Sequence, residues 1–275
     1  MNDVADTTAR RPVPAHVVDV AGLPTTYRRA GSGDPVLVLT GQGHPSQWLP
    51  FYDALAERFD VIVPEHPGFG ETPLPDFIRD FNDLSVHYAG LLDALGVSPA
   101  HVIGHSFGAW VAAELAGLYP ERIRSLTLVS PTGVLPDVEE PMPDWYRMSR
   151  EQYLDRALGE ERERWAAFTE TAADPAEQLL ADYQERTGVA RVAWNPRYSL
   201  RLEHRLQRLQ APAQVIVPDE DRLTPASVAR RYSELLSDAP VITVSGDDGP
   251  TQHLLVLQAP ERIAERVAAL TAAGL

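Results

Sequence analysis

Cysteine and lysine are both absent from this chain. The 275-residue sequence holds no cysteine, and all of its 24 basic residues are arginine. Without cysteine there is no disulfide, no thiolate nucleophile and no thiolate-bound metal. Without lysine there is no Schiff-base chemistry and no Ser-Lys dyad. The residue inventory alone therefore excludes several kinds of covalent catalysis.

Excess positive charge and long apolar runs are missing as well. The formal net charge of −15 argues against binding to a nucleic-acid backbone or an anionic membrane surface. No window approaches the roughly 18 apolar residues of a membrane span, and no apolar signal-peptide core follows Arg10 and Arg11. We expect a cytoplasmic protein that acts on a small molecule, and the sequence leaves its oligomeric state open.

The common cofactor and metal motifs are also lacking. The chain contains no G-x-x-x-x-G-K, no G-x-G-x-x-G and no H-E-x-x-H. His101 and His105 are four residues apart, but they fall on a predicted strand and its turn rather than on one helix face. We therefore expect no cofactor and no metal site.

Short β-branched and apolar runs alternate with helical patterns from residue 15 onward. Many of these runs are continuous, which is typical of strands that are buried on both faces. The predicted strands are residues 17–20, 25–29, 36–39, 61–63, 101–104, 125–129, 214–217 and 241–244. The alternation predicts an α/β fold with a mostly parallel eight-stranded sheet flanked by helices, and the first strand pair as its antiparallel edge.

The strand pattern is interrupted after Gly133. Residues 135–208 contain helical runs and many tryptophans and tyrosines, but no convincing strand. The simplest account is a core of residues 15–134 and 209–275, with a helical cap at 135–208 inserted after the sixth strand as a lid. Residues 1–14 are expected to form a disordered tail.

The strongest motif is Gly104-His105-Ser106-Phe107-Gly108, which matches G-x-S-x-G. Three fixed positions in five are common by chance, so the predicted strand before the motif and helix after it carry the inference. The serine would stand on a tight, strained turn. The backbone N–H of Phe107 would then lie at a helix N-terminus, where it can stabilise an oxyanion.

A serine hydroxyl needs a base to become a strong nucleophile. Among eight histidines we favour His253, because it follows the last strand through a loop that can reach the sheet edge. It also comes last in chain order, as the base does in this kind of triad. His44 and His66 lie in loops that could also line the site.

The third group of such a triad is a carboxylate that orients the imidazole. The loop after residues 214–217 offers Asp219, Glu220 and Asp221. We favour Asp221, with Asp219 and Asp137 as the alternatives.

Four segments, in order, resemble the α/β-hydrolase superfamily, and the resemblance spans about residues 15 to 273. Thr40-Gly41-Gln42 is similar to the family's oxyanion segment, and 65–70 to the loop after its fourth strand. Residues 221–225 resemble its acid loop, which supports Asp221. His253, seven residues before Pro260, matches the spacing of the family's catalytic histidine.

The resemblance implies that the N–H of Gln42 is the second oxyanion donor beside Phe107. The sequence departs from the family pattern at three places. Thr40 stands where histidine is usual, and Pro218 and Gln252 stand where glycine is common. None of these changes removes a group that the chemistry needs.

The predicted function is hydrolysis of an ester, lactone or thioester of a small hydrophobic substrate through an acyl-enzyme. Aromatic residues of the cap suggest contacts with such a substrate, although packing of the cap on itself explains them equally well. The candidate substrate-binding residues are Gly41, His44, His105, Trp145, Trp165 and Trp194.

Other functions on the same scaffold stay open. A C–C hydrolase acting on a β-diketone would use the same triad, but the ring-cleavage-product hydrolases usually carry tryptophan after the histidine, where this chain has Leu254. A lyase, a cyclase or a ligand receptor is also compatible, because fold does not fix function. A serine at the turn argues against the dehalogenase and epoxide-hydrolase branches, which use aspartate there.

Overall fold

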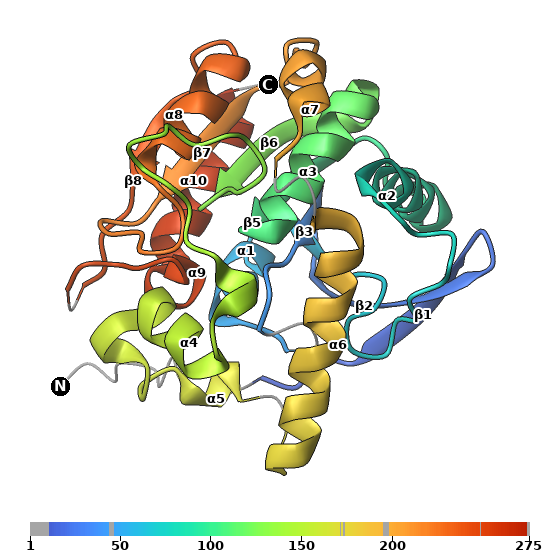
Figure 1. The fold of residues 1–275 in the computed structure, drawn as a ribbon. Helices are drawn as coiled ribbons and strands as arrows, with labels where there is room; N and C mark the ends of the chain where they lie inside the picture. Colours follow the sequence, from blue (N-terminus) through green and yellow to red (C-terminus); the bar gives the residue numbers. More distant parts are fainter. Residues whose placement is uncertain are drawn as a thin grey trace, which may run out of the picture.

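The computed structural model describes residues 11–43, 47–170, 172, 174–194, 198–247 and 249–273. Its centre is an eight-stranded sheet in the order β1-β2-β4-β3-β5-β6-β7-β8 (Figure 1). The strands are β1 (Ala15–Val20), β2 (Leu23–Gly31), β3 (Pro35–Leu39), β4 (Asp60–Pro64), β5 (Ala100–His105), β6 (Ile123–Val129), β7 (Ala213–Val217) and β8 (Val241–Thr243).

Pairing within the sheet follows the predicted pattern. β2 is antiparallel to both β1 and β4, and the other neighbouring strands are parallel. The carboxyl ends of β3, β5, β6 and β7 therefore meet at one edge of the sheet, where loops from distant parts of the chain can converge. The structure confirms the predicted fold class, including the antiparallel edge.

The central strands are apolar because they are covered on both faces. In β3, Leu37 and Leu39 pack into one core cluster, and Val36 and Val38 pack into the other. This alternation is expected because successive strand side chains point to opposite faces of a sheet. Every residue of β5 is buried, so the strand that leads to the G-x-S-x-G turn is held from both sides.

Helices of the core cover the two faces of the sheet. α2 (Phe81–Leu95), α3 (Phe107–Leu118) and α8 (Ala226–Leu235) contribute to the first cluster. α1 (Pro50–Ala56), α9 (Leu255–Gln258) and α10 (Pro260–Ala273) contribute to the second. α2 begins at a capping box formed by Asp80 and Asp83 and ends at Gly96, whose φ of 66° suits glycine.

A helical insertion follows β6, as predicted. It holds α4 (Arg150–Leu158), α5 (Ala166–Thr169), α6 (Pro175–Ala193) and α7 (Leu200–Leu206). In Figure 1, α4, α5 and α6 lie together at the bottom of the view, whereas α7 lies at the top beside α3. Leu202 and Leu206 of α7 are buried in the same cluster as α3, so the last helix before β7 packs on the core.

The predicted disordered tail falls mostly outside the described residues. Residues 11–14 have no regular secondary structure, and β1 begins at Ala15. Within the part of the chain that the structure covers, no helix has both the length and the apolar character needed to cross a bilayer.

Candidate active site

Ser106 occupies a sharp turn between β5 and α3. Its φ of 54° and ψ of −116° lie outside the regions that non-glycine residues normally adopt. The turn is held because the Ser106 N–H donates to the Val129 carbonyl at 2.9 Å and the Ser106 carbonyl accepts from Ala109 at 3.0 Å. The hydroxyl is therefore presented at the carboxyl edge of the sheet.

Close backbone approach explains the two glycines of the motif. A Cβ atom at Gly104 would lie 2.4 Å from the Cα of Ala109. A Cβ atom at Gly108 would lie 2.1 Å from the carbonyl oxygen of Leu39 on the neighbouring strand. Both distances are too short for any side chain, so the motif's spacing follows from the packing of the turn against β3 and α3.

The structure brings the predicted base and acid to Ser106. His253 Nε2 lies 2.8 Å from Ser106 Oγ, and His253 Nδ1 lies 2.9 Å and 3.1 Å from the two carboxylate oxygens of Asp221. An ionised carboxylate only accepts, so Nδ1 carries the proton and Nε2 is left to accept from the serine hydroxyl. The imidazole is 2% exposed, which keeps bulk water from this hydrogen bond.

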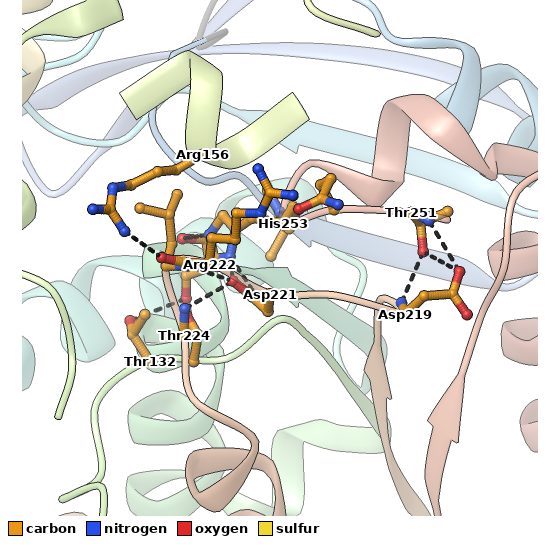
Figure 2. Close-up of polar contacts among 12 residues, drawn as sticks. Thr132, Arg156, Asp219, Asp221, Arg222, Thr224, Thr251 and His253 are labelled. Carbon is orange, nitrogen blue, oxygen red and sulfur yellow. Dashed lines mark hydrogen bonds and ion pairs between the residues drawn. The ribbon is translucent and has the colours of Figure 1, made fainter. Parts of the chain in front are cut away.

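Asp221 is fixed by its own loop. Its Oδ1 accepts hydrogen bonds from the backbone N–H groups of Leu223 at 2.9 Å and Thr224 at 2.8 Å. Arg156 of α4 donates to the Arg222 carbonyl at 3.3 Å, so the insertion also contacts this loop (Figure 2). These contacts set the direction in which the carboxylate faces His253.

The alternative acids have other partners. Asp219 accepts from Ser245 Oγ at 2.7 Å and from the Thr251 N–H at 3.0 Å, and Figure 2 shows it turned toward Thr251 and away from His253. Burial raises the pKa of Asp219, but the hydrogen bonds from Thr251 and Ser245 outweigh it and leave this pKa below its ordinary value. Asp137 is 61% exposed and pairs with an arginine of α8.

A pocket opens beside the serine. Ser106 and His253 line it together with Gln42 and Phe107, the two residues expected to donate to an oxyanion. Phe107 is the first residue of α3, and the first N–H groups of a helix have no carbonyl partner within the helix. Its N–H is therefore available to an anion in this pocket.

Two buried histidines support the loops of the site. His66 is 1% exposed, and its Nε2 donates to the Thr40 carbonyl at 2.9 Å, beneath the oxyanion segment. Burial lowers the pKa of His66 to about 4, so the ring is neutral. His105 Nε2 donates to the His253 carbonyl at 3.0 Å. Both histidines hold backbone rather than line the pocket.

Of the other residues predicted to contact the substrate, some lie at the pocket beside Ser106 and others lie elsewhere. A Cβ at Gly41 would lie 2.8 Å from His105 Nδ1, so a residue without a side chain is needed there. Trp145 lines the pocket. Trp165 is 3% exposed and lines a cavity beside Gly246, and Trp194 is 58% exposed and lines a hollow on the α2 side. His44 lies outside the described residues.

Residue-type reasoning missed part of the pocket wall. Thr132, Tyr153, Leu223 and Thr224 also line the space beside Ser106. Thr224 belongs to the acid loop and Thr132 follows β6, so their positions after strands could have suggested them. Tyr153 lies on α4, and nothing in the local sequence indicates which way it points.

A second pocket adjoins the first. The two share Gln42, Trp145 and Tyr153. The lining of the second includes four charged side chains, which are Arg150, Asp182, Glu185 and Arg186. Sequence reasoning missed them all, although the last three are three and four residues apart and so share one helix face.

Among the described residues, no group of three or more His, Asp or Glu side chains is arranged so that it could hold a metal ion. The absence of cofactors stays a prediction.

Comparison with known proteins extends these findings. Residues 34–160 match the family model for the alpha/beta hydrolase fold. A 2-hydroxy-6-oxononadienedioate/2-hydroxy-6-oxononatrienedioate hydrolase of Burkholderia vietnamiensis is 30% identical over 232 residues, covering 78% of this chain and 81% of that protein. A 2-hydroxymuconate semialdehyde hydrolase of Pseudomonas sp. strain CF600 is 35% identical over 119 residues, but the match covers only 42% of each.

Solved structures agree on the fold. A meta-cleavage product hydrolase from Pseudomonas fluorescens IP01 superimposes with a TM-score of 0.74 at 22% identity, covering 96% of this chain and 99% of that one. The topology of the sheet, the family model and the extent of the match to the Burkholderia protein together show that this chain belongs to the α/β-hydrolase family of enzymes.

Proposed function

We propose that this protein is a serine hydrolase that cleaves an ester-type bond of a small molecule through an acyl-enzyme at Ser106. One observation carries the proposal. Hydrogen bonds run from Ser106 Oγ to His253 Nε2 at 2.8 Å and from His253 Nδ1 to Asp221 at 2.9 Å. This is the arrangement that makes an alcohol oxygen nucleophilic near neutral pH.

The reaction follows from these contacts. Ser106 Oγ attacks the substrate carbonyl while His253 takes its proton, and the resulting oxyanion is held by the N–H groups of Phe107 and Gln42. One such donor is typically worth about 3–4 kcal/mol. His253 then gives the proton to the leaving group and activates the water that releases the acyl group from Ser106.

The first pocket favours a hydrophobic group on the substrate. Trp145, Tyr153 and Leu223 give it apolar walls, with the polar atoms of the triad at one end. We propose an ester, lactone or thioester with a small apolar acyl or alcohol part, acted on in the cytoplasm.

The test combines turnover with labelling. The protein is incubated with p-nitrophenyl acetate, with p-nitrophenyl butyrate and with a serine-directed phosphonate, and its intact mass is measured. We expect turnover of the esters and one phosphonyl group per chain, with neither in Ser106→Ala. A correctly folded protein that takes up no label would rule out the acyl-enzyme route.

C–C bond hydrolysis is the second candidate. A relative named as a 2-hydroxy-6-oxononadienedioate/2-hydroxy-6-oxononatrienedioate hydrolase is 30% identical over most of both chains. The second pocket presents Arg150 and Arg186, which suit a carboxylate-bearing substrate. Leu254 after His253 weakens this candidate, because tryptophan is usual there in those enzymes.

A comparison of rates on the two classes of substrate distinguishes the two candidate functions. Rates are measured for the p-nitrophenyl esters and for a carboxylate-bearing vinylogous diketone, whose cleavage removes its absorbance. We expect the higher kcat/KM with the esters. A diketone that is cleaved more efficiently than any ester reverses the order of the two proposals.

A further inference from the structure

Glu185 is a buried carboxyl group that joins the insertion to the oxyanion loop. It lies on α6 and is 4% exposed. Its Oε2 accepts a hydrogen bond from the Gly43 N–H at 2.8 Å, across 142 residues of sequence. Gly43 directly follows Gln42, which lines both pockets. The contact therefore reaches the peptide next to the expected second oxyanion donor.

The charged surroundings of Glu185 leave it without a close cation. The groups facing it are Asp182 and Arg186 from α6 and Arg150 and Tyr153 from α4. Arg150 Nε pairs with Asp182 at 3.0 Å, and Arg186 Nη1 donates to the Met148 carbonyl at 2.9 Å. Within the described ranges, no arginine lies within salt-bridge distance of the Glu185 carboxyl.

Burial then decides its protonation state. Loss of hydration raises the pKa of Glu185 to about 8, and the charge of Asp182 adds to the rise. The Gly43 hydrogen bond and the charges of Arg150 and Arg186 oppose it without cancelling it. At neutral pH the side chain is a neutral carboxylic acid. Its carbonyl oxygen still accepts from Gly43, so the contact does not require ionisation.

The charge of Glu185 matters because its contact with Gly43 lies next to Gln42, the expected oxyanion donor. The amide of Gln42 would stabilise a negative oxygen during the reaction, and a negative Glu185 one residue away would repel that oxygen. A neutral acid can fix the Gly43 peptide without adding this repulsion.

We propose that Glu185 is a positioning residue, which as a neutral acid holds the Gly43 peptide and thereby orients the Gln42 N–H toward the oxyanion. This inference rests on the proposed acyl transfer at Ser106. The oxyanion hole is then complete only when α6 packs on the core.

The experiment is a pH profile of kcat and KM with p-nitrophenyl butyrate, corrected for hydrolysis in buffer alone. Wild type, Glu185→Gln and Glu185→Ala are compared from about pH 6 to about pH 9.5. Glutamine keeps an oxygen for the Gly43 N–H but cannot ionise, and alanine removes the contact. Glu177→Gln, an exposed acid of the same helix, is the matched control.

Wild-type kcat should fall severalfold as the pH rises through about 8. Glu185→Gln should stay within about threefold of wild-type kcat at low pH and lack this fall, and Glu185→Ala should lose about tenfold in kcat with little change in KM. Glu177→Gln should follow wild type throughout. A purely structural role would not remove a titration from kcat while leaving KM unchanged.

Two results would overturn the inference in distinguishable ways. If Glu185→Gln retains the wild-type fall, the side chain does not act through its charge, although acyl transfer stands. If wild type neither turns over the ester nor takes up phosphonate at Ser106, the proposed function fails and this inference fails with it.

Discussion

The two adjoining pockets are built from different parts of the chain. The one beside Ser106 takes its reactive groups from turns at the ends of core strands, after β5, β7 and β8. The one beyond it takes its charged groups from α4 and α6 of the insertion. Different segments therefore supply most of the lining of the two pockets, although Trp145 and Tyr153 of the insertion border both.

Asp221 and Arg186 differ in how fully they are bonded. Asp221 accepts from two backbone N–H groups and from His253. Arg186 of the second pocket, by contrast, has one hydrogen bond among the described residues, to the Met148 carbonyl. A carboxylate with all of its partners in place is pre-organised, whereas the Arg186 guanidinium retains N–H donors for a ligand.

Replacement of Ser106 is expected to have the largest effect, and it should act on kcat rather than on KM. Ser106→Ala should lower kcat by at least about 10⁴-fold on every substrate, because His253 and Asp221 act only through the nucleophile. It should leave KM nearly unchanged, since the second pocket is intact. Steady-state kinetics with two esters of different charge, alongside a circular dichroism check of folding, provide the measurement. A residual rate above about one-hundredth of wild type would show that Ser106 is not the nucleophile.

Substitution of Asp221, one of two aspartates in the same loop, is expected to have the next largest effect on kcat. Asp221→Asn should lower kcat by about 10⁴-fold, because an amide can donate to Nδ1 and leave the proton on Nε2, the wrong tautomer. Asp219→Asn is the matched control, and it should cost less than about tenfold because Asp219 bonds only to Thr251 and Ser245 among the described residues. The reverse order of effects would identify Asp219 as the acid.

The residues around Ser106 could be predicted because their sequence signals are local. Ser106 lies where a buried strand meets a helix. A Cβ atom at either motif glycine would lie only 2.4 Å or 2.1 Å from a neighbouring backbone atom, so glycine is required there. Asp221 and His253 follow strands whose carboxyl ends share one edge. In a parallel sheet, the order of strands and helices is enough to bring such residues together.

The second pocket could not be predicted because it depends on which faces of α4 and α6 pack against the core. Glu185 and Arg186 have the sequence pattern of a solvated helix face, yet Glu185 is 4% exposed. Residue type alone predicts Trp165 and Trp194 as substrate contacts, but in the structure both line other cavities. A helical period fixes which residues share a face, but not which face meets the core.

The buried acid gives a smaller, pH-dependent effect on stability. Between pH 4.5 and about 8 the folded state keeps a proton on Glu185 that the unfolded chain releases. Wild type should therefore lose stability relative to Glu185→Gln as the pH rises through this window, by up to about 1.4 kcal/mol per pH unit. Above about pH 8 the difference should level off.

Urea unfolding of both proteins at several pH values measures this difference directly. Other ionisable groups are common to the two proteins and cancel in the comparison. Glu177→Gln on the same helix controls for the loss of one acidic residue. A difference between wild type and Glu185→Gln that stays constant with pH would mean that Glu185 is ionised in the folded protein throughout.

The smallest expected effect separates substrate choice from chemistry. Arg186→Gln should raise KM for a carboxylate-bearing ester, such as mono-p-nitrophenyl succinate, by about tenfold, the loss of one charge-assisted hydrogen bond. kcat should stay nearly constant, and p-nitrophenyl butyrate should be little affected, because Arg186 lines the second pocket and not the one beside Ser106. Arg147→Gln, which removes a side chain that is 87% exposed, is the matched control. An equal rise in KM for both esters would mean that Arg186 supports the fold of the insertion. The second pocket would then have no separate role in the choice of substrate.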